Sequence, residues 1–212
     1  GTGINWMPLP LVKNLIVSNG IGGMDTTSFY YGNAQYDVDR HQFIGFAMSA
    51  MKSNNKVSET FMSRVRRGSS GSNGSFSMLV PDSVVNYIAP SAAEFGNSPY
   101  WSFCAHLFLP TDDNLISRTT NTYNTLYRTN VSGNVSFLPY AATSTTYNHR
   151  KNTKVIKTLS MNGSNWHPTQ EYTQSGYISG STELPIRQYV NYTYTQMTLL
   201  NGVSVLKPTK QV

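Results

Sequence analysis

The sequence predicts an all-β protein, an antiparallel β-sandwich of Greek-key or jelly-roll type. Several stretches alternate apolar and polar side chains with a period of two, and the clearest are Lys154–Met161 and Ile186–Leu200. Charged residues contribute only 12% of the chain, about half the usual share, and 14 tyrosines with many Ser, Thr and Asn residues take their place. Such a composition favours strands and loops over helices.

The N-terminal third predicts a first strand and then a hairpin with a long loop. The first strand is expected over Leu11–Val17. Val57–Val65 alternates cleanly, a Gly/Ser-rich stretch follows over 68–74, and Phe76–Val80 returns as a strand. Flexible loops on a rigid sandwich usually carry recognition residues, so this loop is a candidate binding region.

Two apolar stretches each allow a strand or a short helix. In Gln42–Met51, the aromatic side chains are spaced three apart, as in a helix, whereas Gly45 favours a buried strand. In Ser83–Ala89, either Asp82 or Ser83 could cap a short helix. Tyr100–Leu109 is the most strand-like stretch of the chain and is expected to be a central strand.

The middle of the chain predicts the Greek-key connection. Val135–Leu138 reads as a short strand that ends at Pro139, because proline cannot donate a ladder hydrogen bond. A polar crossing follows, and the chain returns in the alternating strand Lys154–Met161. Asn162-Gly163 closes that strand with a common tight-turn pair. A strand, a long crossing and a return strand are typical of a sandwich rather than of a meander.

This segment resembles the heads, or knobs, of adenovirus fibres. Those heads have a Phe-Met-Pro triplet, a Tyr-Pro pair, a Lys/Asn-rich loop and a strand that ends in Leu-Asn-Gly. The corresponding residues here are Phe137-Leu138-Pro139, Thr146-Tyr147 and Met161-Asn162-Gly163, with Asn148 where the family has proline. Trp6-Met7-Pro8-Leu9-Pro10 is similar to the element that joins fibre shaft and head.

The C-terminal strand supports the same resemblance. Asn191-Tyr192-Thr193-Tyr194-Thr195 resembles the aromatic strand that ends the fibre heads, although here Asn201-Gly202 and a further short strand over 203–206 follow it. The resemblance implies a shaft–head junction over 1–10 and a single sandwich head over 11–212. Because the chain begins at Gly1, we expect it to be the C-terminal piece of a longer protein.

The resemblance also implies a function, partners and a location. A fibre head forms a homotrimer at the virion surface, in particles assembled inside the host cell. It binds a host receptor, which in this family is an immunoglobulin-domain adhesion protein or a sialylated glycan. The single residue Cys104 agrees with assembly in a reducing compartment, since it excludes an internal disulfide.

Charge and hydropathy argue against nucleic-acid and membrane partners. The net charge is +6, but the basic residues are scattered and carry no recognised nucleic-acid motif. A mildly positive surface would equally favour acidic cell-surface glycans. No apolar stretch approaches the roughly 20 residues that span a bilayer, so we expect no membrane insertion.

No arrangement of residues predicts an enzyme, a metal site or a cofactor. Asp37 and Asp39 share a side of an extended segment, and Asp112-Asp113 is a turn pair, yet nothing places either pair across a cleft. The histidines are far apart in the sequence and lack metal-ligand spacing. No Gly-x-Ser-x-Gly motif is present.

The candidate receptor-binding residues are loop aromatics and basic residues, because Tyr and Arg are enriched among interface hot spots. They are Tyr30, Tyr31, Arg66, Arg67 and Asn73. Packing of the two tyrosines against the edge of the core is the alternative for that pair. For the whole chain, the alternatives to a fibre head are a structural jelly-roll capsid subunit and a receptor-binding tip of a phage tail fibre.

Overall fold

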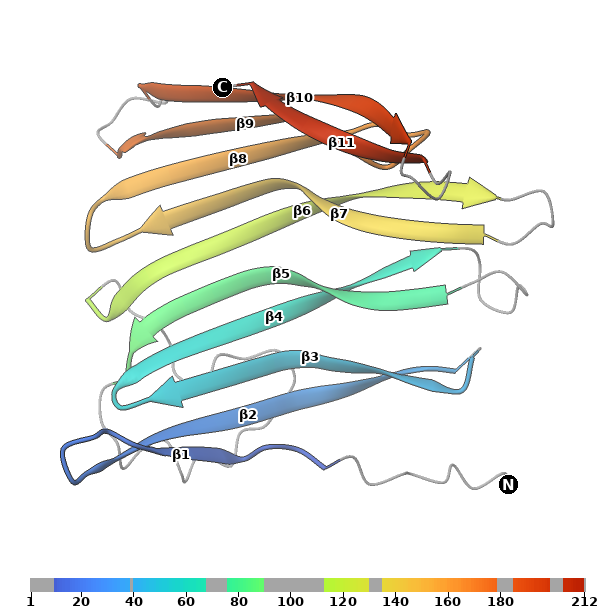
Figure 1. Cartoon of the computed structure of the whole chain (residues 1–212). Coiled ribbons are helices and arrows are strands. Elements are labelled where there is room, and N and C mark those ends of the chain that lie inside the picture. Colours follow the sequence, from blue (N-terminus) through green and yellow to red (C-terminus); the bar gives the residue numbers. More distant parts are fainter. Residues whose placement is uncertain are drawn as a thin grey trace.

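The fold is seen in a computed structural model, which describes residues 10–38, 40–67, 76–89, 113–129, 135–178, 185–198 and 204–211. These residues form eleven strands and no helix (Figure 1). The strands are β1 (Asn14–Ser18), β2 (Met24–Asp37), β3 (Gln42–Ser53), β4 (Lys56–Arg67), β5 (Phe76–Ile88), β6 (Leu115–Thr129), β7 (Val135–Asn148), β8 (Thr153–Met161), β9 (Pro168–Tyr177), β10 (Ile186–Thr198) and β11 (Ser204–Gln211).

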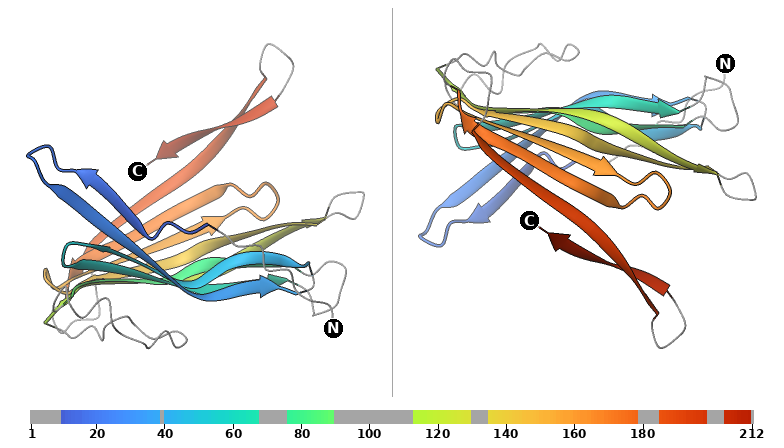
Figure 2. Two further views of the ribbon diagram at one scale, coloured as in Figure 1. Left: turned by 90° about the horizontal axis from the view of Figure 1, so that it is seen from below. Right: turned by 90° about the horizontal axis from the view of Figure 1, so that it is seen from above.

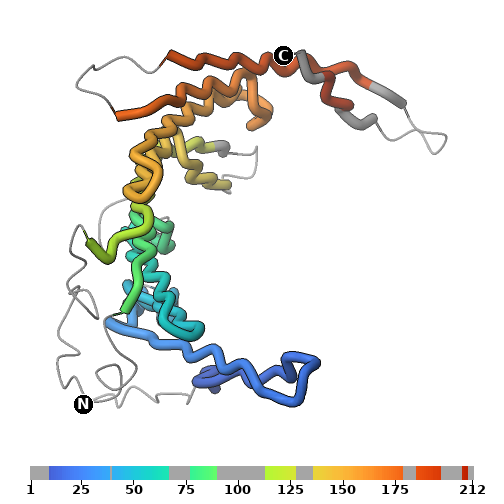
Figure 3. The backbone as a smooth tube through the Cα atoms, turned by 90° about the vertical axis from the view of Figure 1, so that its left-hand side faces the viewer, coloured from blue at the N-terminus to red at the C-terminus, as the bar shows by residue number. Residues whose placement is uncertain are grey.

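All eleven strands belong to one antiparallel sheet, in which each strand pairs with its neighbours in the chain. The order therefore runs from β1 to β11 without a crossover among the described strands. The sheet is bent, so that β1–β2 at one end and β10–β11 at the other turn towards the same side (Figure 2). Viewed along its edge, the backbone follows an open arc (Figure 3).

The predicted all-β class and antiparallel pairing are confirmed, whereas the predicted Greek-key connection is not found where the sequence placed it. The polar stretch after Pro139 is not a crossing, since it continues β7 to Asn148 and pairs with β8. The sandwich, which needs a second packed layer, remains a prediction.

Pro139 is tolerated inside β7 because of where the neighbouring strand ends. It pairs with Thr125 of β6, but the pairing of β7 with β8 begins only at Thr143. The proline therefore lies where β7 has a ladder partner on one side alone, and proline within sheets is confined to such edges. The sequence therefore predicted that the strand ends at Pro139, whereas in the structure the strand continues and Pro139 lies at a local edge of the sheet.

Several other predictions can be compared with the strands. Both stretches that allowed a short helix are extended: Gln42–Met51 lies in β3, and Ser83–Ala89 forms the end of β5 as far as Ile88. The hairpin expected from Val57–Val65 and Phe76–Val80 is confirmed by the pairing of β4 with β5. Tyr100–Leu109 lies outside the described residues.

A small apolar core covers one face of β4, β5 and β6. Its buried residues are Val57, Val85, Tyr87, Ala89 and Leu115, and Tyr30 and Phe61 pack against them. The cross-strand pairs Val57–Tyr87 and Tyr87–Leu115 place these side chains on a common face. The fully buried Glu59 lies on the same face, where its Oε1 accepts a 2.6 Å hydrogen bond from the Tyr87 hydroxyl.

Candidate binding site

The two predicted tyrosines occupy neighbouring positions of β2 and have different surroundings. Tyr30 packs against the apolar core, as the packing alternative proposed. Tyr31 has its ring centroid 5.2 Å from that of Phe46, which in turn lies 5.2 Å from Phe43 in an edge-on contact. Because adjacent residues of a strand point to opposite faces, the pair does not offer one surface to a ligand.

The predicted basic residues lie elsewhere. Arg66 is exposed on β4, in register with Ser77. It is seven positions further along β4 than Glu59, which lies in the cross-strand row of Tyr30. That separation is roughly 20 Å of strand. The backbone of Arg67 ends β4, whereas its side chain and the whole of Asn73 lie outside the described residues. The described candidates therefore do not converge on one site.

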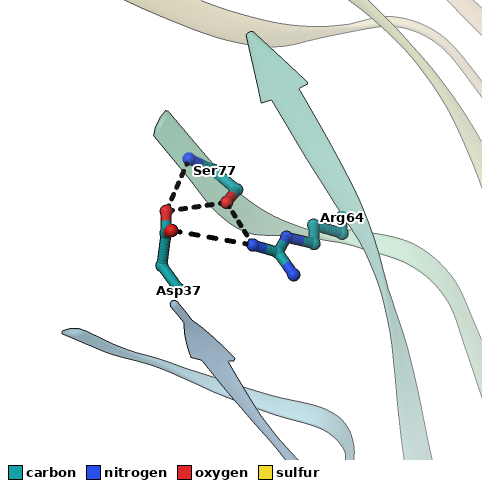
Figure 4. A network of polar contacts seen from close by, with 3 residues as sticks. All are labelled: Asp37, Arg64 and Ser77. Carbon is teal, nitrogen blue, oxygen red and sulfur yellow. Dashed lines mark hydrogen bonds and ion pairs between the residues drawn. The ribbon is translucent and has the colours of Figure 1, made fainter. Parts of the chain in front are cut away.

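A buried polar network lies beside Arg66 and joins three strands (Figure 4). Asp37, at the end of β2, is only 2% exposed. Its Oδ2 accepts hydrogen bonds from the Ser77 backbone N–H at 3.2 Å and from the Ser77 hydroxyl at 2.8 Å. Arg64 donates to Ser77 Oγ at 2.6 Å and lies 3.9 Å from Asp37 Oδ1. These contacts tie the end of β2 to the β4–β5 hairpin.

The register brings a different set of residues together on the C-terminal half of the sheet. Three rows of paired positions cross the same face of β6–β10. The rows are Arg118, Tyr147 and Lys154; Thr120, Thr145, Ile156, Gln174 and Arg187; and Thr122, Thr143, Thr158, Tyr172 and Tyr189. We call this surface the basic face. It continues the face that carries the apolar core, because Arg118 pairs with Val85.

Aromatic contacts order the side chains of the basic face. The Lys154 ammonium lies 5.0 Å from the centroid of the Tyr147 ring, within the range of a cation–π contact. Tyr172 and Tyr189 are a cross-strand pair whose rings stack at 4.3 Å with a 24° interplanar angle. Tyr189 is still 50% exposed, and Arg118 and Arg187 are exposed.

The pKa of Tyr172 depends on neighbouring side chains of the basic face. Partial burial raises the pKa of Tyr172, and its contact with Tyr189 raises it further. The Arg187 charge and a hydrogen bond from Gln174 act in the opposite direction on that pKa. Tyr189, Gln174 and Arg187 are therefore the neighbours that influence the Tyr172 hydroxyl.

The opposite face of the same strands has a different character. The Tyr192 hydroxyl donates to Glu171 Oε2 at 3.2 Å, and burial together with this bond raises the pKa of Tyr192. His167 stacks on Tyr194 at 4.8 Å. Glu171 is the only acidic residue in the sequence of β6–β10, and its pairing with Val190 places it on this side. The basic face thus has no carboxylate within these strands.

The described residues hold no cluster of His, Cys, Asp and Glu that could bind a metal ion. In the same part of the chain, no helix is long and apolar enough to cross a lipid bilayer. A scan of protein-family models and a search of curated proteins found no match to this sequence. The function of the site is therefore inferred from the chemistry of its residues.

Sequence reasoning missed the basic face because its residues are distant in the chain. Arg118, Lys154 and Arg187 are separated by more than 30 positions each and belong to three different strands. The one local signal was the run of Thr and Tyr residues in β6, β7 and β10, which was interpreted only as strand-forming. Cross-strand register, which sequence alone leaves open, is what aligns them.

Proposed function

We propose that this chain is the receptor-binding head of a virion attachment fibre, which binds a ligand on the host cell surface. The segments that resemble adenovirus fibre heads support attachment, and the strand-rich architecture with neither helix nor metal cluster among the described residues is compatible with a binding role. In this proposal the active form is a homotrimer on the virion surface.

The basic face is the observation that carries the binding role. It presents tyrosine hydroxyls, threonines and cations across five neighbouring strands, and of the cations Arg118 and Arg187 are exposed and Lys154 is partly exposed. An extended surface of this kind suits recognition of a large or polymeric ligand, whereas small-molecule chemistry usually takes place in a concave pocket. The mild positive charge of the whole chain would aid approach to a negatively charged cell surface.

The first experiment measures binding of the fluorescently labelled chain to cultured cells, together with its mass by light scattering. We expect saturable binding that excess unlabelled chain displaces, and the mass of a trimer. A mass corresponding to dozens of copies would indicate a capsid subunit instead. Absence of saturable binding to a panel of cell types by a folded trimer would contradict the attachment role.

The residues predicted from sequence are tested in the same assay. A variant with Tyr30, Tyr31, Arg66, Arg67 and Asn73 all changed to alanine should lose attachment if the receptor site lies there. Because Tyr30 packs against the core, a second variant that keeps it separates loss of binding from loss of folding. Unchanged attachment of both variants would remove these residues from the site.

A further inference from the structure

We infer that the basic face binds a linear anionic glycan that carries sulfate groups, and that the polymer lies across the strands rather than along them. This inference rests on the proposed attachment function and names its ligand class. It starts from the spacing of the cations. Arg118, Lys154 and Arg187 come from β6, β8 and β10, so each is separated from the next by one intervening strand.

The cations are evenly spread over the strands. Neighbouring strands lie about 4.8 Å apart, so Arg118, Lys154 and Arg187 are spaced about 10 Å apart across the sheet. Arg118 and Lys154 share one row, and Arg187 belongs to the next row, two residues further along the strands. Tyr147 and Tyr172 occupy the intervening strands β7 and β9. A chain of sugars with regularly placed anionic groups can contact successive cations without bending sharply, whereas a compact ligand with one charge would reach only one of them.

The sequence of β6–β10 places no carboxylate on the basic face. Within β6–β10 the one acid, Glu171, is engaged with Tyr192 on the opposite face. No carboxylate of these strands therefore neutralises Arg118 or Lys154. Such a surface attracts a polyanion over several ångströms, and the attraction weakens as added salt screens the charges.

The aromatic geometry favours a glycan over single-stranded nucleic acid. Nucleic-acid surfaces of this kind stack bases on exposed aromatic rings. Here the Tyr172 and Tyr189 rings stack on each other, and the Lys154 ammonium covers one face of Tyr147. These residues therefore present mainly hydroxyls and cations to a ligand. The threonine hydroxyls of β6, β7 and β8 lie beside them. Sugar hydroxyls and sulfates are the natural partners of such groups.

The test compares two triple variants of equal charge on a heparin-coated surface. The first replaces Arg118, Lys154 and Arg187 with alanine. The second, a matched control, replaces the exposed residues Lys13, Lys56 and Lys157 with alanine. The register places Lys56 and Lys157 on the opposite face of the sheet, and Lys13 lies outside β6–β10. We expect the first variant to bind heparin about ten- to hundredfold more weakly, since each exposed ion contact contributes a fraction of a kilocalorie. The control should change binding less than threefold.

Further arms identify the ligand chemistry. Chemically desulfated heparin should bind much more weakly than heparin, and a thymidine oligonucleotide should bind more weakly than a heparin oligosaccharide of equal charge. Equal losses in the two triple variants would show that net charge alone drives binding and would overturn the inference. Tighter binding of the oligonucleotide would overturn it in favour of nucleic acid.

Folding and attachment are separated from the inference by two further measurements. Circular dichroism checks that each variant keeps its strands, and the single charge reversal Arg118→Glu replaces the triple variant if that variant does not fold. Cell attachment of the unmodified chain should fall after enzymatic removal of sulfated glycans. On untreated cells, attachment that persists with the first variant would leave the attachment function standing and defeat the glycan assignment. Absence of attachment to untreated cells by the unmodified chain would defeat the function itself.

Discussion

At the scale of single residues, the most consequential contact is the hydrogen bond between two fully buried groups, the Tyr87 hydroxyl and the Glu59 carboxyl. A carboxyl group removed from water requires hydrogen-bonding partners, because its desolvation is otherwise uncompensated. Tyr87 supplies such a partner while its ring fills the core beside Val57 and Val85. One side chain therefore serves both the polar and the apolar part of the interior.

Replacing Tyr87 with phenylalanine should destabilise the protein by about 1–3 kcal/mol, because the ring is kept while the buried carboxyl group loses a donor. The free energy of unfolding is measured by urea denaturation. Tyr177→Phe is the matched control, since Tyr177 is 73% exposed and its change should stay within about 0.5 kcal/mol. Equal effects of the two substitutions would show that the Tyr87–Glu59 bond does not contribute.

Residue-scale features were only partly predictable from sequence. Packing of Tyr30 at the core edge was one of two stated alternatives, because an aromatic ring in a polar stretch suits either role. The basic face was not predictable, since a shift of one residue in register moves a side chain to the other face of the sheet. Such a shift occurs between Asn86 and Tyr87 in the pairing of β5 with β6, just before the ladder reaches Arg118.

At the scale of elements, the hairpin of β7 and β8 shows how pairing on one or both sides changes what a strand tolerates. The first half of β7 accommodates Pro139 because β8 does not reach it. Thr145, in the second half, pairs with both Thr120 and Ile156. Its backbone therefore has ladder neighbours on two sides.

Thr145→Pro should consequently destabilise the sheet by at least about 1–3 kcal/mol, since proline removes a ladder donor from a central position and strains its neighbours. Thr145→Val is the control, because it keeps the backbone N–H and the β-branched shape. Thermal unfolding followed by circular dichroism measures both. A proline variant as stable as the valine variant would contradict the central position of this part of β7.

Alternating strands were predictable, and strands without alternation were not. Val57–Val65 and 154–161 alternate and lie in β4 and β8, and 186–198, the described part of the alternating stretch 186–200, forms β10. By contrast, β9 carries mostly polar residues on both faces, so the sequence predicted no strand there. The order of the strands could not be read from periodicity, because a crossing and a long strand with few apolar residues look alike in sequence.

At the scale of the whole molecule, the two outer strands of the described sheet differ in how they are protected. In β1, Leu15, Ile16 and Val17 are between 51% and 61% exposed, and the strand has no charged residue. The β11 sequence contains two lysines and a proline. Lysine and proline at a sheet edge hinder further strand addition, whereas an apolar edge promotes it.

Ile16→Lys should therefore slow aggregation of the concentrated protein on heating, because it places a charge on the unprotected edge. Light scattering over time measures the rate. Met51→Lys is the control, since Met51 is also an exposed apolar residue, at 43%, but pairs with Phe29 of β2 and with Ser58 of β4 on its two sides. Identical rates for the two variants would show that β1 does not nucleate aggregation.

The strand order has a consequence for how the chain acquires its shape. Every ladder of the described sheet joins strands that are consecutive in the chain, and most of these strands are connected by only a few residues. The entropy lost in closing a loop grows with its length, so this arrangement keeps contact order low for an all-β protein. Each hairpin can add to the one before it as the polypeptide leaves the ribosome. The slowest pairing is that of β5 with β6, because the connection between these two strands is long.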